Sequence, residues 1–261
     1  MDLDSFTKNG FVVQEFKNKN RLFEAQQLVH SQFPCDPLKW HQQNVSPEEH
    51  VIRVKKTLDA LLASNLVPGV IQENKDEFIS VLGPDMDVQA SPHVRITRPE
   101  VEGDAVDWHR DSFYGSTVWE LNVWFPLFPL GKGAGIRILP GSHAMPSCNV
   151  RDGQDPNAFR KTVAKGSVAH QIGFVYAPKT DDTLANMNPT DTVLLSPDFG
   201  SFVMFFGCAI HKGQNQSSLT RVSVDVRIKN SFTPTNTRAG YYQCLSRSVL
   251  ANVAQQFHDG N

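Results

Sequence analysis

The spacing of hydrophobic residues predicts helices in the first third of the chain and strands in most of the rest. Over residues 21–31, apolar side chains recur at intervals of three and four, which places them on one face of a helix. Shorter helices are expected at 6–10, where a glycine ends the segment, and at 76–82. Between the first two helices, the apolar run at 11–13 predicts a first strand.

A longer helix has a clear predicted start. Ser46 can cap its first turn, Pro47 occupies the first helical position, and Glu49 can close a capping box. We expect this helix to run to about Asn65 and to end before Pro68-Gly69, because proline and glycine both disfavour a continuing helix.

From His93 onward, hydrophobic and polar residues alternate with a period of two, which predicts strands. Turn-forming residues, among them Lys212-Gly213, separate the alternating runs, which are 94–97, 118–125, 136–139, 202–206 and 222–228. Many short strands behind a helical region favour a mainly β, α+β fold, an antiparallel barrel or jelly roll buttressed by the N-terminal helices. We expect one domain over residues 1–261, helical to about residue 90 and with its jelly-roll core over about 91–230.

The stretch 147–197 is polar and shows no clear hydrophobic period. Connections of this length without secondary structure of their own are uncommon in compact domains and usually carry a function. We therefore expect this segment to cover a binding site. Charged residues near the segment or near the motifs described below include Arg98, Arg151 and Lys212.

Composition and charge narrow the class of protein. Of the 261 residues, 40% are hydrophobic and 20% are charged, which is ordinary for a globular protein that can bury a sizeable core. The net charge is -2, so no basic surface is expected to attract nucleic acid or an anionic membrane. We expect a small-molecule partner, and the oligomeric state stays open.

Targeting and redox signals are few. The first residues lack the cationic and apolar regions of a signal peptide, and no run approaches the roughly 18 apolar residues of a membrane span. The four cysteines are far apart and form no CxxC pair, so a structural zinc site held by thiolates is not expected. Reduced cysteines and a cytoplasmic location are the expectation.

The candidate chemistry begins with His109 and Asp111, which are two residues apart. In an extended strand, residues at this spacing point to the same side, so the imidazole and the carboxylate share one space while Arg110 turns away. A third ligand from another strand, His211, would complete two histidines and one carboxylate. This set leaves part of the coordination sphere open, as in the facial triad of non-heme Fe(II) oxygenases.

Residues 221–228 alternate almost perfectly, with four apolar residues on one face and four polar residues on the other. Two interpretations are open. The polar face can lie in solvent, or it can line a pocket while the apolar face packs under the helices.

Four motifs in order resemble the phytanoyl-CoA dioxygenase family. They are WHRD at 108–111, LNVWFPL at 121–127, ILPGSH at 138–143, and His211 followed ten residues later by Arg221. The resemblance covers residues from about 6 to about 230 and implies an oxygenase on a double-stranded β-helix, which is a jelly roll. Two positions depart from the family, which often has Asn-Gly where this chain has Gly133-Ala134 and favours an apolar residue at Arg137.

The resemblance also implies roles for individual residues. His109, Asp111 and His211 would hold Fe(II), with the remaining positions free for the cosubstrates 2-oxoglutarate and O2. A guanidinium matches a carboxylate bidentately, so Arg221 suits the distal carboxylate of 2-oxoglutarate. Further candidates for the same cosubstrate site are Ser223, Trp124 and Asn122.

The reaction implied is hydroxylation of a C–H bond, with 2-oxoglutarate converted to succinate and CO2. Because the middle ligand, Asp111, is a carboxylate and not alanine or glycine, no coordination site is vacated for a halide. Hydroxylation is therefore expected in place of halogenation. Desaturation or ring closure by the same cofactor stays open.

Two arginines are candidates for binding the substrate. Arg95 shares a strand face with His93 and Thr97, and Arg137 interrupts an otherwise apolar strand. An unpaired buried charge is very costly, so Arg137 needs a paired anion or solvent. We expect a small polar or anionic metabolite at these arginines and not an acyl-CoA, with an exposed outer face as the alternative for Arg137.

Two further classes of function stay open. The first is a cupin-like metal enzyme of the same barrel type that uses no 2-oxo acid, and it would not need Arg221 at this place. The second is a non-catalytic barrel used as a binding module, which would be expected to have lost a metal ligand. Binding of 2-oxoglutarate together with Fe(II) separates the oxygenase from both.

Overall fold

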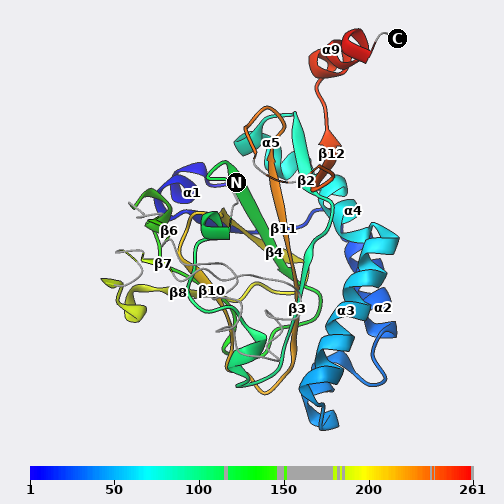
Figure 1. Cartoon of the computed structure of the whole chain (residues 1–261), viewed down its shortest axis with the longest axis vertical. Helices are drawn as coiled ribbons and strands as arrows, with labels where there is room; N and C mark the ends of the chain where they lie inside the picture. Colours follow the sequence, from blue (N-terminus) through cyan, green and yellow to red (C-terminus); the bar gives the residue numbers. More distant parts are fainter. Residues whose placement is uncertain are drawn as a thin grey trace.

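Most of the described strands form two antiparallel sheets that pack face to face (Figure 1). The computed structural model describes residues 1–114, 117–145, 150–151, 179–180, 183, 186–235, 237 and 239–259. The larger sheet has the order β1 (Phe11–Glu15), β9 (Ser201–Phe206), β4 (Glu120–Pro126), β11 (Arg221–Asn230), β2 (Met86–Gln89) and β12 (Tyr242–Ser246), and β3 (His93–Thr97) also pairs with β11. The smaller sheet has the order β10 (His211–Asn215), β5 (Ala134–Ile138) and β8 (Val193–Leu195).

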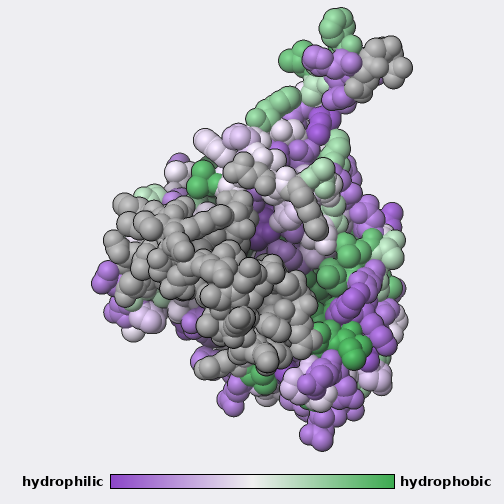
Figure 2. All heavy atoms as spheres, viewed as in Figure 1, coloured by the Kyte–Doolittle hydropathy of each residue, from purple (hydrophilic) through white to green (hydrophobic). Residues whose placement is uncertain are grey.

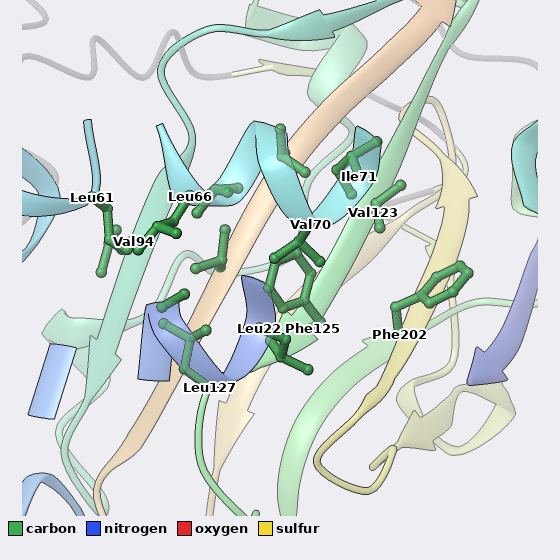
Figure 3. Packing of buried hydrophobic residues seen from close by; sticks show 14 of the residues in the cluster. Leu22, Leu61, Leu66, Val70, Ile71, Val94, Val123, Phe125, Leu127 and Phe202 are labelled. Carbon is green, nitrogen blue, oxygen red and sulfur yellow. The ribbon is translucent and has the colours of Figure 1, made fainter. Parts of the chain in front are cut away.

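Three helices cover the outer face of the larger sheet, as Figure 1 shows: α2 (Asn20–Ser31), α3 (Pro47–Ser64) and α4 (Leu66–Glu73). Their apolar side chains and those of the sheet form one cluster, in which Leu22 and Val70 pack near Phe125 (Figure 3). Two shorter helices precede strands, α1 (Leu3–Asn9) and α5 (Asp76–Leu82). The helical start and strand-rich remainder predicted from hydrophobic spacing are therefore confirmed.

The remaining described elements are short or peripheral. They are the 3-10 helices η1 (Pro37–Gln43), η2 (Glu102–Asp104), η3 (Asp111–Tyr114), η4 (Ser142–Ala144) and η5 (Pro189–Asp191), the two-stranded sheet of β6 (Val150–Arg151) and β7 (Lys179–Thr180), and the C-terminal helix α9 (Val249–Asp259).

Most of the connection 147–197, which was expected to cover a binding site, lies outside the described residues, as does the side chain of Arg151. No helix in the described ranges has the length and apolar character needed to cross a membrane.

The start and the end of α3 are as predicted, but the helix that follows it was not predicted. Ser46 Oγ accepts a hydrogen bond from the Glu49 N–H and the Glu49 carboxylate accepts one from the Ser46 N–H, which completes the capping box. After α3, Asn65 adopts a left-handed conformation (φ 51°) and a new helix, α4, begins. Pro68 lies in the first turn of α4, where a missing N–H removes no helical hydrogen bond. The prediction that α3 ends at about Asn65, before Pro68-Gly69, is therefore confirmed, whereas the separate helix α4 was not predicted.

Several strands were missed or placed incorrectly by the period-two pattern. Residues 212–213, expected to form a turn, lie inside β10, which pairs with β5. Glycine fits there because a Cβ on Gly213 would lie 2.8 Å from Nη2 of Arg221. The short strands β2, β8 and β12 were not predicted either, because runs of three to five residues carry little period of their own.

The central strand β11 shows how the two faces of the larger sheet differ. Its even-numbered residues, from Val222 to Ile228, pack in the cluster beneath the helices. Its odd-numbered residues point to the opposite face, toward the smaller sheet, and are buried as well: Arg221, Ser223, Asp225, Arg227 and Lys229. The polar face of β11 is therefore an interior surface and not a solvated one.

Candidate metal centre

The two histidines meet at a short bridge between distant parts of the chain. His109 and His211 exchange backbone hydrogen bonds of 3.0 and 2.9 Å. Asp111 does not continue a strand, because it begins the 3-10 helix η3 and its N–H donates to the Gly207 carbonyl at 2.7 Å. The expected extended strand over His109 and Asp111 is thus reduced to a single bridge, yet the side chains still converge.

The ligand atoms of His109, Asp111 and His211 lie within 4.8 Å of one another, and all three residues are buried. Oδ1 of Asp111 lies 3.4 Å from Nε2 of His109 and 3.9 Å from Nε2 of His211. Among the residues that the structure describes, this is the one group of His, Cys, Asp and Glu side chains with metal-binding geometry.

The tautomer of each histidine follows from its neighbours. Nδ1 of His109 lies 2.6 Å from the Asp107 carbonyl, and Nδ1 of His211 lies 2.9 Å from the Ala209 carbonyl. A carbonyl can only accept, so Nδ1 carries the proton and Nε2 is left with its lone pair. Burial and the neighbouring His109 lower the pKa of His211 to about 4, so its Nε2 is unprotonated near neutral pH.

Asp111 is oriented by two donors that use the same oxygen. Nδ2 of Asn122 donates to Oδ2 at 2.6 Å, and Nη2 of Arg227 lies 3.1 Å from Oδ2. Burial alone would raise the pKa of Asp111, but Arg227 and the two histidines hold it well below its ordinary value. Oδ1 is thereby left as the carboxylate oxygen that faces the two Nε2 atoms.

Arg227 is itself fixed from the side opposite Asp111. Its Nη1 donates to the Tyr241 hydroxyl at 2.6 Å, and its Nε lies 3.8 Å from Oε2 of the buried Glu120. Arg227 was not among the site residues predicted from the sequence. The signal that could have found it is the polar face of β11, on which both arginines lie.

Arg110 turns away from the metal ligands, as expected, but it is not in solvent. It is 1% exposed, and its guanidinium donates to the carbonyls of Ser142 and Cys208. These bonds tie the WHRD segment to the PGSH turn and to the chain just before His211.

His143, at the end of the PGSH turn, has a structural role, because its ring stacks on Phe206 and its Nε2 lies 2.9 Å from the Thr7 carbonyl.

Arg221 is a buried cation held by neutral groups. Its guanidinium donates to the Thr97 hydroxyl at 2.9 Å and to the carbonyls of Gln214 and Gly135. Its Nε has no hydrogen-bond partner, and no carboxylate within the described ranges lies at ion-pair distance from it. Burial, with a contribution from Arg95, lowers the pKa of Arg221 to about 9, so the group is still charged near neutral pH. Such a cation fits an anionic ligand.

One small cavity joins Arg221 to the metal centre. Its described lining consists of Arg95, Ala105, Val106, His109, Trp124, Ile136, His211, Gly213, Arg221 and Asp225. The guanidinium of Arg221 lies 5.7 Å from the ring centre of Trp124. Ser223 lies on the same face of β11, is fully buried, and has a hydroxyl without a hydrogen-bond partner. The structure therefore brings the three predicted metal ligands together with Arg221, Trp124 and Arg95. Asn122 reaches the site through Asp111, whereas Ser223 lies on the same face of β11 but outside the described lining of the cavity.

Arg137 lies on the other face of its strand. Its neighbours Ile136 and Ile138 pack between the two sheets, so Arg137 points outward. There its guanidinium donates to Gln214 Oε1 at 2.7 Å and to the Thr192 hydroxyl at 3.1 Å. This placement does not support a role for Arg137 in binding substrate at the barrel mouth.

A second cavity of about 520 Å³ adjoins the first and shares Ala105, Val106 and Gly213 with it. Its remaining described lining is mostly polar: Thr97, Arg98, Glu100, Val101, Asp107, Lys212, Gln214, Asn215 and Gln216. Arg98 is paired with Asp104, and the Lys212 ammonium lies over the Trp108 ring at 4.9 Å. The two cavities together are larger than the space that a metal ion at this centre would fill.

Comparison with solved structures identifies the fold. The chain resembles the non-heme monooxygenase ThoJ without ligand, with a TM-score of 0.55 and 18% identity over 94% of this chain and 83% of that one. It also resembles a ThoJ–nickel complex (TM-score 0.54, 16% identity, 95% and 84% covered). EvdO2 from Micromonospora carbonacea var. aurantiaca gives a TM-score of 0.52 and 17% identity over 90% and 94% of the two chains.

No protein-family model matches the sequence, and a search of curated proteins found no match. At these identities the structural likeness concerns the fold. It confirms the expected jelly roll, because the sheet-rich α+β arrangement of this chain matches that of these neighbours. The chain therefore combines the fold of a non-heme monooxygenase with a buried His–Asp–His centre.

Proposed function

We propose that this chain is an Fe(II)- and 2-oxoglutarate-dependent dioxygenase that hydroxylates a C–H bond of a small polar molecule. The observation that carries the proposal is one cavity lined by both histidines of the buried His–Asp–His set and by the buried Arg221, which has no acidic partner among the described residues. The fold of the non-heme monooxygenase ThoJ, which also forms a nickel complex, agrees with it.

The donor set fits Fe(II). Two neutral imidazoles and one carboxylate form the two-histidine, one-carboxylate set that binds Fe(II) and leaves positions open for other ligands. His109 and His211 would bind through Nε2, and Asp111 would bind through Oδ1, because its Oδ2 is occupied by Asn122 and Arg227. When bound, Fe(II), 2-oxoglutarate and O2 supply the oxidation, which releases succinate and CO2 and leaves a hydroxyl group on the substrate.

Arg221 would bind the distal carboxylate of 2-oxoglutarate and hold the cosubstrate at its far end. Thr97 fixes the guanidinium, while Trp124 forms the adjacent wall of the cavity. Ser223 has a free hydroxyl two residues along the same face and would add a contact to the cosubstrate. Trp124 and Arg221 are buried, and the low dielectric around buried groups strengthens each of these polar interactions.

The same residues favour hydroxylation over halogenation, because Asp111 occupies a ligand position with a carboxylate. We also infer that the chain forms one domain. The larger hydrophobic cluster joins side chains from Phe6 to Leu245, so the helices and the sheets share a core.

The test is anaerobic addition of Fe(II) and 2-oxoglutarate to the whole protein. A weak visible charge-transfer band, together with succinate formation on exposure to O2, is the expected result. His211→Ala should lose metal binding and the band while its unfolding stays cooperative. Metal binding without any effect of 2-oxoglutarate would favour a cupin-like enzyme, and no metal binding would favour a binding module.

A further inference from the structure

Asp225 is a buried carboxylate in the metal cavity for which the proposed binding of 2-oxoglutarate gives no role. It lies on the polar face of β11, directly opposite Trp124 on β4. It is 9% exposed and lines the cavity together with His109 and His211. Its position puts it on the wall between the metal centre and Arg221.

One oxygen of Asp225 has no donor. Oδ2 lies 3.8 Å from Nδ1 of His93, whereas Oδ1 is buried and accepts no hydrogen bond from any described residue. Burial raises the pKa of Asp225, but His93 and Arg227 outweigh it, so the carboxylate is charged. A buried charged acceptor without a donor is costly. A donor from outside the chain is therefore expected when the site is filled.

The charges around Asp225 limit what that donor can be. A carboxylate or phosphate of a substrate would meet the like charge of Asp225 at short range. An ammonium group would pair with Asp225, but it would lie beside the bound metal ion and the positive field of Arg227, both of its own sign. A neutral donor avoids both penalties, and a hydroxyl group is the smallest one.

We propose that Asp225 accepts a hydrogen bond from a hydroxyl group of the substrate, which makes the substrate a neutral hydroxylated molecule. The inference rests on the proposed oxygenase function and names its substrate class. The adjoining cavity of about 520 Å³ agrees with it, because most of the residues that line it are polar. This substrate class replaces the anion that was expected from Arg137.

The test measures binding and not turnover. The whole protein is loaded with Mn(II) and 2-oxoglutarate under anaerobic conditions and titrated with three panels of similar size. These are methyl glycosides and cyclic polyols, then carboxylates and phosphates, then amines. We expect the tightest binding from the hydroxylated panel, read as dissociation constants by calorimetry.

Two variants separate the charge of Asp225 from its shape. Asp225→Leu should lower the affinity for the best hydroxylated compound about tenfold or more, because a hydrogen bond to a charged acceptor is lost. Asp225→Asn keeps the shape of the side chain, and it should lower the affinity for this compound less than Asp225→Leu does. Asp87→Asn is the matched control, since Asp87 pairs with Lys229 and Arg247 and is not among the described residues that line either cavity. Thermal unfolding of each variant shows that it folds.

The outcomes for the two proposals are distinct. If the wild-type protein fails to bind 2-oxoglutarate with metal, the oxygenase proposal falls. If 2-oxoglutarate binds but anions or amines bind more tightly than hydroxylated compounds, only the role of Asp225 is overturned. The role of Asp225 is also overturned if Asp225→Leu binds every hydroxylated compound as tightly as the wild type does.

Discussion

His109 and His211 each commit one ring nitrogen to a backbone carbonyl, and Asp111 commits one oxygen to Asn122 and Arg227. At the scale of the residue, each ligand thus directs its other donor atom toward the other two, and these three atoms lie within 4.8 Å of one another. Partners of this kind fix the tautomer and orientation of metal ligands before the ion arrives. The site therefore needs little rearrangement to bind a metal ion.

Asn122→Leu should weaken the affinity for Mn(II) or Fe(II) by roughly 10- to 100-fold, the usual effect of removing such a partner. The substitution removes the 2.6 Å hydrogen bond to Oδ2 of Asp111 at similar side-chain volume. Competition with a metal chelator measures the affinity. Ser223→Ala is the control, because Ser223 lines the same face and has no bond to Asp111. Equal metal affinity in Asn122→Leu and the wild type would contradict this role.

Arg221→Ala should lower the affinity for 2-oxoglutarate by about 30-fold or more. Loss of one partner of a buried, hydrogen-bonded charge pair costs about 2–5 kcal/mol, and each 1.4 kcal/mol is about tenfold. Titration of the Fe(II)-loaded protein with 2-oxoglutarate measures the change. Arg137→Ala removes an arginine from the outer face of β5 and should leave this affinity unchanged. The reverse pattern would assign the cosubstrate to Arg137.

At the scale of the element, β11 and α3 show how the larger sheet holds both core and site. Each residue of β11 contributes to one of two buried surfaces, because apolar and polar side chains alternate along it. Helix α3 packs on β3, and its buried His50 accepts a hydrogen bond from the Trp40 indole at 3.2 Å. Its Nε2 faces Asp104 at 3.5 Å.

The packing of α3 should depend on pH. Burial lowers the pKa of His50, and the attraction of Asp104 offsets this only in part. The unfolded chain, with a histidine pKa of about 6.5, therefore binds more protons than the folded chain as the pH falls below that value. The contribution of a neutral His50 to stability is complete above about pH 6.5 and is lost progressively below it.

We expect the free energy of unfolding to fall between about pH 6.5 and pH 5 and to fall less steeply in His50→Asn. Asparagine keeps an acceptor for Trp40 but cannot be protonated in this range. Urea unfolding at several pH values gives both slopes. Parallel slopes for the two proteins would show that other buried histidines, such as His93, cause the effect.

At the scale of the whole molecule, α9 projects beyond the body and follows β12 (Figure 1). Its apolar side chains are exposed, and Figure 2 shows hydrophobic and hydrophilic residues side by side on it: Val249, Leu250, Val253 and Phe257 are the exposed large hydrophobic ones. None of the described residues of α9 is buried, so the helix adds little to the core.

A chain that ends after Ser248 should therefore have a midpoint temperature of thermal unfolding within about 2 °C of that of the full chain. A loss of stability below about 1 kcal/mol shifts this temperature by only a few degrees in a protein of this size. Ser248 is kept because its N–H and hydroxyl bind Asp85. Thermal unfolding at two protein concentrations measures the change. A large decrease that depends on concentration would show that α9 packs against a second copy of the chain.

Much of the candidate site was predictable because its signals are local. The spacing of His109 and Asp111, the strict alternation over 221–228 and the capping box at Ser46 each depend on a few neighbouring residues. The order of the motifs indicated the fold, which comparison with ThoJ confirms. The resemblance to a known family, together with the fit of a guanidinium to a carboxylate, pointed to Arg221 as the group that binds 2-oxoglutarate.

The tertiary structure decided everything that depends on partners from distant strands. Arg137 and Arg221 look alike in sequence, yet one faces Gln214 and Thr192 on the outside while the other lies in the cavity. A period of two tells which residues share a face and not which face is buried. The roles of Arg227 and Asp225 can be inferred only from the tertiary structure. In it, β4 places Asn122 opposite Arg227, and β3 places His93 opposite Asp225. A buried polar group is defined by the donors and acceptors around it, and those come from other parts of the chain.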